Sequence, residues 1–541
     1  MACKGYISMK KMIKLSLFAL FVISFSGCNE KNEPVKEMIQ KKEQIQKVQE
    51  IKTVEPIEQI KKDSNISKGS TNSDQKTDKI CIKEPEQTTP NPTPKGDLVA
   101  KEISRSYPKI ELQRQSCDDE KGALEDLDFD IIKKGFEDDN TLLVVGGIQG
   151  DEPGGFMAAS LLATKYKIVK GSVWVIPNLN FYSIIKRSRG PYGDMNRKFA
   201  HISKDDPDYK SIQRIKKYIK HQDVKLILNL HDGSGYYRPT YIDKDHNPRK
   251  WGQSVVIDQA KLENIKHYNN LEEISKVVVE HMNKNLIKKE DFYRIKNTNT
   301  KHKTTFEEKE MAKTLTYFAI KNGKSAFGHE TSKSLSIEDR VYYKLLAFEK
   351  YMDIMDIKYK RDFNLDPAVI KNILDNDIDI SLYNGKIKLP LAEVRNIINY
   401  FPVKKDGTID FIPNNPLVSI IREHDLYTIY YGNRRVSRLK ADFVEHTEDN
   451  IDIDFNVDGI DEKYKFGDAI DVKKEFLIKP LSDYRINVIG YINDKDIETD
   501  VKIEHKDMLK RFSIDKSGLK YRIEFYKNEK FAGMIVVNFI G

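Results

Sequence analysis

The sequence predicts an α/β domain with a mixed, largely parallel sheet flanked by helices, followed by two domains made mainly of β-strands. Three observations indicate this architecture. Short apolar runs alternate with helical patterns up to about residue 360, and short strands separated by turn residues follow. From Asp449 onward apolar and polar side chains alternate. A chain of 541 residues is also too long for one compact domain.

The first domain is predicted to span residues 98–360. Four apolar runs are expected to form buried strands: Thr141–Val145, Ser172–Ile176, Lys225–Leu230 and Ser325–His329. Helical patterns lie between or after them, at Phe156–Tyr166, Lys210–His221, Leu271–Leu286 and Ile337–Ile354. Because strands alternate with helices, most neighbouring strands should pair in parallel.

The two remaining domains read differently. Residues 361–443 contain short strands such as Ile387–Leu391 and Leu426–Tyr431, which predict a small β-rich, barrel-like domain. Residues 444–541 contain more regular strands, such as Ile451–Val457 and Arg522–Tyr526. Regular alternation of this kind predicts an antiparallel, immunoglobulin-like β-sandwich.

Residues 1–28 have the anatomy of a secretory signal. A basic segment from Met9 precedes the apolar run Leu15–Phe25, and the pair Ser26-Gly27 precedes Cys28. The apolar run is too short to cross a membrane. The end of the segment resembles a bacterial lipobox, which implies a lipid on the Cys28 sulfur and a periplasmic protein anchored to a bacterial membrane. The phenylalanine before Ser26 departs from the usual leucine, so a secreted protein with a chance cysteine is the alternative.

Residues 29–97 are expected to form a disordered tether. They are rich in Lys, Glu, Gln, Ser, Thr and Pro, and this composition cannot bury enough apolar surface to fold alone. Cys3 leaves with the signal, so Cys81 and Cys117 remain besides the lipidation site. An oxidising compartment permits a disulfide between them, but the sequence does not indicate whether they pair.

The charge balance argues against a protein that binds nucleic acid. The chain carries 91 basic and 83 acidic residues, a net charge of +8. It has no basic stripe interleaved with aromatic residues and no known nucleic-acid motif. A mildly basic surface is compatible with weak attraction to acidic cell-wall polymers. The oligomeric state is not indicated.

Two polar side chains, Gln149 and Glu152, follow the first predicted strand on the glycine-rich turn Gly146–Gly155. Open α/β sheets bind ligands at the carboxyl ends of their strands, and two oxygen donors on one tight loop can converge on a cation. Taken alone, this segment is explained better by a plain structural turn.

His231 occupies the same topological position after the strand Lys225–Leu230. A lone histidine is more often structural, but three donors at strand ends favour a metal ligand. One imidazole, one carboxylate and one amide oxygen, with water in the fourth position, make an open site of the catalytic type. The hypothesis is a single Zn²⁺ bound by Gln149, Glu152 and His231.

A basic segment between these two pieces holds Arg189, Asn196 and Arg197. An adjacent Asn-Arg pair can grip a carboxylate in two directions, because guanidinium geometry matches that of a carboxylate. The earlier Arg189 could face a developing oxyanion. Without the metal site, a solvated basic loop would be the preferred interpretation.

Glu330 lies at the end of the fourth strand-like run. A carboxylate there could deprotonate a metal-bound water and then pass the proton to a leaving amine. An exposed charge at a strand terminus is the alternative. The neighbouring His329 is equally ambiguous and has no assigned role.

The order of these motifs resembles that of the M14 class of zinc carboxypeptidases. In that class His-x-x-Glu and a later His bind zinc, a late Glu is the general base, and an Asn-Arg pair holds the terminal carboxylate of the substrate. Gln149 stands where the class has His. This replacement makes residues from about 98 to 355 similar to the murein DL-carboxypeptidases that set helical cell shape in Campylobacter-like and Helicobacter-like bacteria. The two later domains also suit that subfamily.

The resemblance implies a substrate and a role for each residue. Enzymes of this subfamily remove meso-diaminopimelate from the tripeptide L-Ala-γ-D-Glu-meso-diaminopimelate. Asn196 and Arg197 would hold the free carboxylate, zinc and Arg189 would polarise the γ-glutamyl carbonyl, and Glu330 would activate water. Trp251 would line the pocket for the diaminopimelate side chain, although a packing role is just as plausible.

The glutamine itself has a physical consequence. Glutamine and histidine are both neutral donors, so the charge of the metal with its ligands is unchanged. An amide oxygen is a weaker zinc ligand than an imidazole, which predicts looser metal retention than in a His-x-x-Glu relative.

Two other functions stay open at this point. One is a zinc deacylase or amidase on the same fold. The other is a catalytically inactive lipoprotein that binds the cell wall, although the joint presence of Glu152, Arg197, His231 and Glu330 argues against lost activity.

Overall fold

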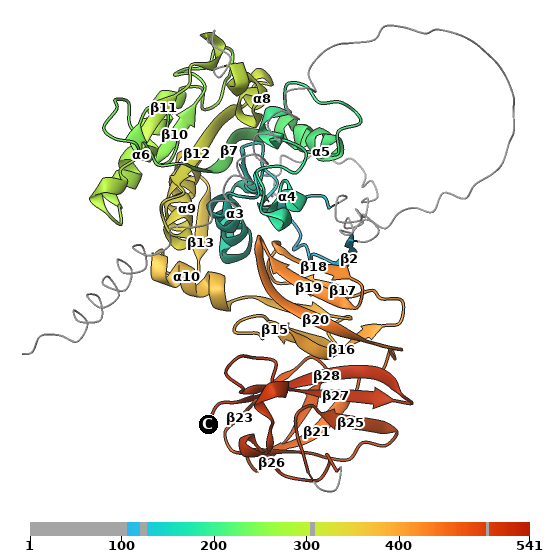
Figure 1. The fold of residues 1–541 in the computed structure, drawn as a ribbon. Helices are drawn as coiled ribbons and strands as arrows, with labels where there is room; N and C mark the ends of the chain where they lie inside the picture. The colour runs from blue at the N-terminus through green and yellow to red at the C-terminus, as the bar shows by residue number, and fades with distance from the viewer. Residues whose placement is uncertain (1–104, 120–126, 303–308, 494–496) are drawn as a thin grey trace, which may run out of the picture. The chain divides into compact units, whose positions relative to one another are not determined.

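The computed structural model of the chain describes residues 105–119, 127–302, 309–493 and 497–541 (Figure 1). The predicted signal peptide with Cys28, the tether and Cys81 therefore lie outside the described residues. Within the described part of the chain, none of the helices combines the length and apolar character needed to cross a membrane.

The first domain is built on a seven-stranded mixed sheet, which confirms the predicted α/β class. The strands in order across the sheet are β11 (Arg294–Asn297), β10 (Ser254–Ile257), β12 (Ser325–Ser332), β7 (Val224–Gly233), β4 (Thr141–Val145), β6 (Ser172–Ile176) and β3 (Ile132–Gly135). Strands β12, β7, β4 and β6 run parallel, whereas β10 and β3 are antiparallel to their inner neighbours.

Helices cover both faces of this sheet (Figure 1). One face packs against α3 (Pro153–Lys165), α6 (Leu271–Lys284) and α9 (Ile337–Ile354), and the other against α5 (Tyr209–Lys220) and α8 (Leu315–Lys321). Side-chain alternation in β4 explains the division, because Leu142 and Val144 enter the first core while Leu143 and Val145 enter the second. A strand buried on both faces needs a continuous apolar run.

The predicted elements agree closely with the structure, with two informative differences. The bounds predicted for β4, β6 and α9 are those observed. Strands β7 and β12 extend past their apolar runs, so His231 and Glu330 lie inside strands, and the prediction that they follow strand ends is wrong. Backbone pairing continues in register to Ser332 and Gly233, while the side chains on one face change from apolar to polar.

The small second domain is β-rich as predicted, but its described strands form two open sheets and no closed barrel. One sheet has the order β16 (Ile398–Lys404), β20 (Arg434–Val444), β19 (Leu426–Tyr431), β18 (Val418–Glu423) and β2 (Cys117–Asp118). The other has the order β1 (Arg114–Gln115), β17 (Asp410–Pro413), β14 (Asp379–Leu382) and β15 (Ile387–Pro390). Helix α10 (Pro367–Asn376) precedes all of these strands except β1 and β2.

Strands β1 and β2 belong to a segment that we assigned to the first domain, yet they pair with β17 and β18. Two-residue strands carry no periodic pattern, so the sequence offered no sign of this pairing. Cys117 in β2 is buried and disulfide-bonded.

The last domain is a β-sandwich as predicted, but not a fully antiparallel one, because β23 pairs with β28 in parallel. One sheet has the order β22 (Ile460–Lys465), β21 (Asp452–Val457), β24 (Glu475–Ile478) and β26 (Ile503–Glu504). The other has the order β23 (Ala469–Val472), β28 (Lys530–Phe539), β27 (Lys520–Lys527) and β25 (Tyr484–Val488). Alternate residues such as Ile453, Phe455, Ile523 and Phe525 form a core of their own.

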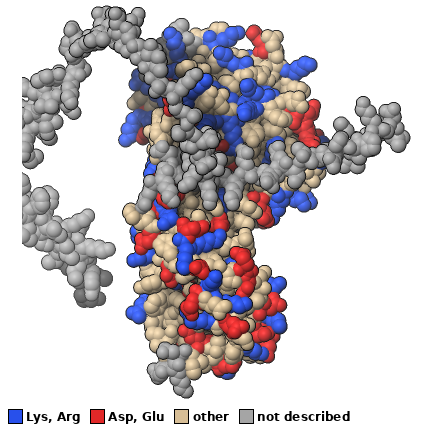
Figure 2. Space-filling view, turned by 90° about the vertical axis from the view of Figure 1, so that its right-hand side faces the viewer, with Lys and Arg blue, Asp and Glu red and all other residues tan. Residues whose placement is uncertain are grey.

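Charged side chains are unevenly spread over the face shown in Figure 2. Figure 2 shows Lys and Arg side chains gathered in its upper part and mixed with Asp and Glu lower down. Helix α5 contains no acidic residue and exposes Lys210, Lys217 and Lys220. This distribution fits a mildly basic surface.

Candidate active site

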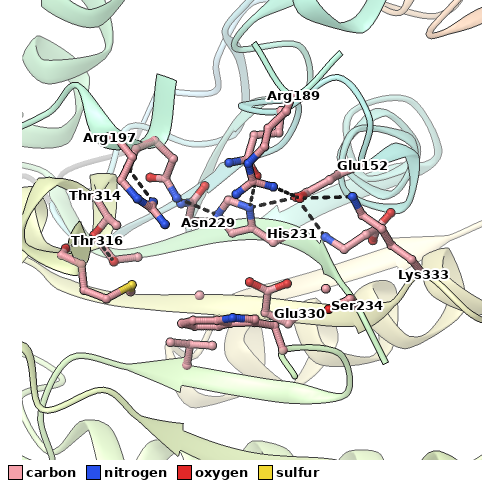
Figure 3. Close-up of a pocket in the computed structure, with 18 residues that line it drawn as sticks. Glu152, Arg189, Arg197, Asn229, His231, Ser234, Thr314, Thr316, Glu330 and Lys333 are labelled. Carbon is pink, nitrogen blue, oxygen red and sulfur yellow. Dashed lines mark hydrogen bonds and ion pairs between the residues drawn. The ribbon is translucent and has the colours of Figure 1, made fainter. Parts of the chain in front are cut away.

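A pocket of about 240 Å³ lies at the carboxyl ends of β7 and β12 (Figure 3). Ile227 of β7 and Ala326 of β12 belong to the core beneath α5 and α8, so alternation places His231 and Glu330 on that same face of the sheet. All eight residues given a catalytic, metal or substrate role from the sequence line this pocket: Gln149, Glu152, Arg189, Asn196, Arg197, His231, Trp251 and Glu330.

The three candidate metal donors converge. His231 Nδ1 lies 3.1 Å from Gln149 Oε1 and 3.0 Å from Glu152 Oε2, and all three side chains are buried. Donors around a tetrahedral zinc, with bonds of about 2.1 Å, lie about 3.4 Å apart. These residues therefore fit a zinc ion after separating by a few tenths of an ångström.

The amide of Gln149 completes the donor set. Within the described residues, no three His, Cys, Asp or Glu side chains cluster closely enough to hold a metal ion. The Gln149 Nε2 group donates to Asp194 Oδ1 at 2.7 Å, which turns Oε1 toward His231. The turn itself requires Gly150, because a Cβ there would lie 2.0 Å from the carbonyl oxygen of Ser183.

Asp194 is a residue of this site that the sequence analysis missed. Besides Gln149 it accepts a hydrogen bond from Arg189 Nε at 3.1 Å and caps the short helix η2 (Met195–Arg197) through the Asn196 N–H at 2.9 Å. Burial alone would raise the pKa of Asp194, but Arg189, Gln149 and Arg197 together lower it. Its position two residues before Asn196, as a helix cap, was the available signal.

The two arginines and Asn196 face the pocket from this segment. Arg189 Nη1 donates to Glu152 Oε1 at 3.2 Å. Arg197 Nη1 donates to the Asn196 carbonyl oxygen at 3.1 Å, and its ion pairs among the described residues are long, 3.7 Å to Glu310 and 4.0 Å to Asp194. Asn196 Oδ1 accepts from the backbone N–H of Leu315, which leaves its NH2 group 3.3 Å from His231 Nε2. Because its ion pairs are long, Arg197 can turn its remaining N–H groups toward an anion in the pocket.

Glu330 stands beside His231 because the two are partners in the parallel pair β12 and β7. Glu330 is buried, so the alternative of an exposed charge is wrong. Burial raises the pKa of Glu330 to about 7, with Glu152 adding to the rise and His231 opposing it. Such a carboxyl can take up and release a proton near neutral pH.

The pKa of His231 is itself raised. Burial would lower it, but the hydrogen bond to Glu152 and the charges of Glu152 and Glu330 outweigh burial. A cation bound to the imidazole nitrogen would therefore compete with a proton that Glu152 and Glu330 favour.

A buried ionic cluster supports β7 from below the pocket. Lys344 Nζ donates to the His231 carbonyl at 2.7 Å and to Asp232 Oδ1 at 3.0 Å, and Arg340 lies 2.9 Å from Asp232 Oδ2. Burial would raise the pKa of Asp232, but the charges of Lys344 and Arg340 lower it to about 2. This cluster, which the sequence analysis missed, connects β7 to helix α9.

Trp251 and His329 differ in their relation to the pocket. Trp251 lines it, and Lys296 Nζ lies 4.3 Å from the centroid of the indole ring. His329 points to the opposite face of β12, where it is buried and its Nε2 lies 3.4 Å from Sδ of Met282, a residue of the core beneath α6.

Two families match the chain. The one described as a carboxypeptidase controlling helical cell shape, catalytic, matches residues 127–375, and the one described as the C-terminal domain of metallo-carboxypeptidase matches residues 446–540. Crystal structures of the cell shape determinant protein Csd4 from Helicobacter pylori are similar to this chain. The apo structure is 37% identical with a TM-score of 0.69, over 76% of this chain and 100% of that chain.

The chain belongs to this family of cell-shape-controlling carboxypeptidases. It is therefore a peptidase, and membership of a metallo-carboxypeptidase family implies a metal ion. The hypothesis of a non-catalytic lipoprotein is wrong on this point. A structure of Csd4 described as an mDAP-bound D,L-carboxypeptidase is also similar, with 38% identity and a TM-score of 0.67, over 74% of this chain and 96% of that chain. No curated protein sequence matches the chain.

Proposed function

We propose that the chain is a zinc-dependent D,L-carboxypeptidase that removes meso-diaminopimelate from peptidoglycan tripeptide, leaves the dipeptide and so remodels the cell wall and cell shape. The observation that carries this proposal is the convergence of eight residues from separate parts of the chain in one pocket. The proposal is also supported by the tripeptide-bound and product-bound structures of the similar Csd4.

The residues that line the pocket have separate roles in the proposed reaction. Arg197 and Asn196 hold the free carboxylate of the departing residue, since a guanidinium and an amide can donate to both its oxygens. Arg189 donates to the carbonyl oxygen as negative charge develops there. Gln149, Glu152 and His231 would hold the zinc ion, which when bound would supply the Lewis-acid chemistry that polarises the carbonyl and acidifies water.

Glu330 moves the proton. It accepts a proton from the water that attacks the γ-glutamyl carbonyl carbon. As the C–N bond breaks, it delivers that proton to the departing amine nitrogen, so the carboxylate is regenerated. Its raised pKa suits both halves of this transfer.

The cellular arrangement is proposed from the sequence. Cys28 would carry a lipid that anchors the chain to a bacterial membrane on the periplasmic side, and residues 29–97 would tether the catalytic domain, residues 98–360, to that anchor. The two later domains, residues 361–443 and 444–541, follow the catalytic domain.

A muropeptide assay tests the function. The full-length protein is incubated with L-Ala-γ-D-Glu-meso-diaminopimelate, with and without a chelator, and released diaminopimelate is measured by mass spectrometry. We expect release that the chelator abolishes and added zinc restores. No release from tripeptide, together with hydrolysis of N-acyl amino acids, would favour the deacylase alternative.

A further inference from the structure

A second cavity lies at the edge of the first-domain sheet opposite the candidate active site. Its volume is about 390 Å³, larger than that of the catalytic pocket. Lys225 is the second residue of β7 and Lys324 directly precedes β12, so both lie at the amino ends of these parallel strands. His231 lies six residues further along β7, which places the two cavities about 20 Å apart. The candidate active site therefore does not account for the second cavity.

The lining of this cavity carries positive charge without an acidic partner. Its residues are Lys225, Asn264, Ile265, Lys266, His267, Gly323 and Lys324. Among the described residues, no acidic side chain lines the cavity, and the three lysines make no ion pair. Asp223 attracts Lys324, but its carboxylate lies 3.5 Å from His221 Nδ1 and outside the lining.

Two of these lysines are neighbours across the sheet. Ser325 of β12 pairs with Leu226 of β7 in parallel register. The residues directly before them, Lys324 and Lys225, therefore stand side by side, and two like charges at such a separation repel. The pKa of Lys324 is lowered by burial and, next, by the charge of Lys225. An anion between the two ammonium groups would relieve this repulsion.

The charge of Lys324 is held in a fixed place. The residue is 8% exposed, and its Nζ donates to the carbonyl oxygens of His221 at 2.6 Å and Val224 at 2.7 Å. An ammonium group has three protons, so one remains for a ligand. Lys225 Nζ donates to the Gln222 carbonyl oxygen at 2.9 Å and keeps two protons. Support of the backbone explains Lys324, but it does not explain why two further lysines face the same cavity.

The third lysine comes from a loop that is fastened to the start of β12. The backbone N–H of Leu262 donates to the Asn269 carbonyl oxygen at 2.8 Å and closes the loop. Ser325 Oγ lies 2.9 Å from the carbonyl oxygen of His267, which holds the loop against the strand. The side chain of Lys266 is exposed and has no hydrogen bond or ion pair with any described residue. The loop thus brings a third ammonium group to the cavity.

We propose that this cavity binds a phosphate group, held by the ammonium groups of Lys225, Lys266 and Lys324. Ammonium groups are compact point charges that can meet a tetrahedral anion from several directions. A planar carboxylate is matched better by a guanidinium, and no arginine is among the lining residues. The volume falls in the range of pockets for small organic molecules, so the phosphate belongs to a larger polar molecule. The source is a soluble phosphoester or a phospholipid headgroup.

Calorimetry of the full-length protein with glycerol 3-phosphate tests the soluble source. The double variant Lys225→Gln/Lys266→Gln should raise Kd by about tenfold or more for each lysine removed, the size of a hydrogen bond to a charged group. Lys324 is left in place because it also supports the backbone. If the double variant does not fold, Lys266→Gln alone decides, since this side chain is exposed.

The matched control is Lys210→Gln/Lys217→Gln. Both lysines are exposed on α5 and line neither cavity, and their loss changes the net charge by the same amount. The Kd for glycerol 3-phosphate should change little in this variant. The comparison therefore separates a defined site from general attraction between a basic surface and an anion.

Vesicles test the phospholipid source. Co-sedimentation is measured with vesicles of phosphatidylglycerol and, for comparison, of phosphatidylcholine, with Cys28→Ser in every protein so that no lipid anchors it. A lipid headgroup in the cavity predicts binding to phosphatidylglycerol that Lys225→Gln/Lys266→Gln loses and Lys210→Gln/Lys217→Gln keeps. A soluble phosphoester predicts this difference between the variants in calorimetry alone.

Three outcomes would overturn the inference. The first is a wild-type protein that binds neither glycerol 3-phosphate nor phosphatidylglycerol vesicles. The second is an equal effect of the two double variants on binding, including no effect, because the three cavity lysines would then have no special part. The third is binding that excess tripeptide abolishes, which would place the anion in the catalytic pocket. The inference does not depend on the proposed function, and none of these outcomes bears on tripeptide cleavage.

Discussion

The two halves of the candidate metal site are held in different ways. Gln149 sits on a loop and is oriented by one side chain, Asp194, which is itself held by the half-exposed Arg189. His231 sits inside a central strand, in register with Glu330 and above the buried pair of Asp232 and Lys344. We therefore expect that substitutions around Gln149, the loop half of the site, change metal affinity without unfolding the protein. Substitutions around His231 and Glu330, the strand half, affect the folded core as well.

The strand half should carry the largest chemical effect. Glu330→Gln keeps the shape of the side chain but removes the proton acceptor, so kcat for tripeptide should fall by about 10²–10⁴-fold. Metal content and thermal stability should stay near those of the wild-type protein. Steady-state kinetics check this, and a variant that keeps more than about a tenth of the activity contradicts the role.

The buried ion pair beneath the strand half should contribute strongly to the free energy of unfolding. Lys344→Met leaves the buried Asp232 with one partner fewer and should cost about 3–5 kcal/mol of unfolding free energy. Denaturant unfolding measures it. The control is Lys333→Met, whose partly exposed pair with Asp151 should contribute less than about 1 kcal/mol. Equal losses of unfolding free energy in the two variants would show that the buried ion pair contributes no more than the partly exposed one.

The loop half should respond in metal affinity instead. Asp194→Asn weakens the hold on the Gln149 amide and should lower zinc affinity by about 10–100-fold, with little change in melting temperature. Competition with a chromophoric chelator measures the affinity. Asp206→Asn is the control, because it breaks an ion pair with Lys198 in the same segment and touches none of the candidate donors. A melting temperature that falls together with the affinity would argue against the comparison.

Substitution of the loop ligand Gln149 itself should change zinc affinity by a smaller amount and in the opposite direction. Gln149→His replaces an amide oxygen by an imidazole, whose other nitrogen can still donate to Asp194, so zinc should bind more tightly. The same chelator competition checks it. Unchanged or weaker binding would show that donor strength is not what limits metal retention.

The smallest effect is in the pH profile. Glu330 acts as a base only when ionised, and its pKa is raised to about 7, so kcat/KM should fall as the pH drops through this range. A bound cation favours the carboxylate, which places the midpoint at or below about 7. An acidic limb with a midpoint well above 7 would exclude Glu330 as its source.

Local patterns explain what the sequence predicted well. Strand β4 and helix α9 have the predicted bounds because apolar periodicity is a property of neighbouring residues. The meeting of Gln149, Glu152 and His231 followed from one rule, that polar residues near the carboxyl ends of parallel strands gather at one edge of a sheet, and this rule held although His231 lies inside β7.

What the sequence did not reveal depends on distant partners. Lys344 meets Asp232 across 112 positions, and Lys324 meets the carbonyl oxygen of His221 across 103, so neither segment alone marks its residue as special. The barrel prediction failed because closure depends on which edge strands pair, and strand-forming sequences do not encode that. Strands β1 and β2 are too short to show any alternation.

The measurement that tests the central claim most directly is X-ray absorption at the zinc edge of the protein loaded with one equivalent of zinc. A site formed by Gln149, Glu152 and His231 predicts scattering from one imidazole with oxygen donors otherwise, and two imidazoles in the Gln149→His variant. Two imidazoles or a sulfur ligand in the wild-type protein, or an unchanged imidazole count in the variant, would contradict the assignment of glutamine as a metal ligand.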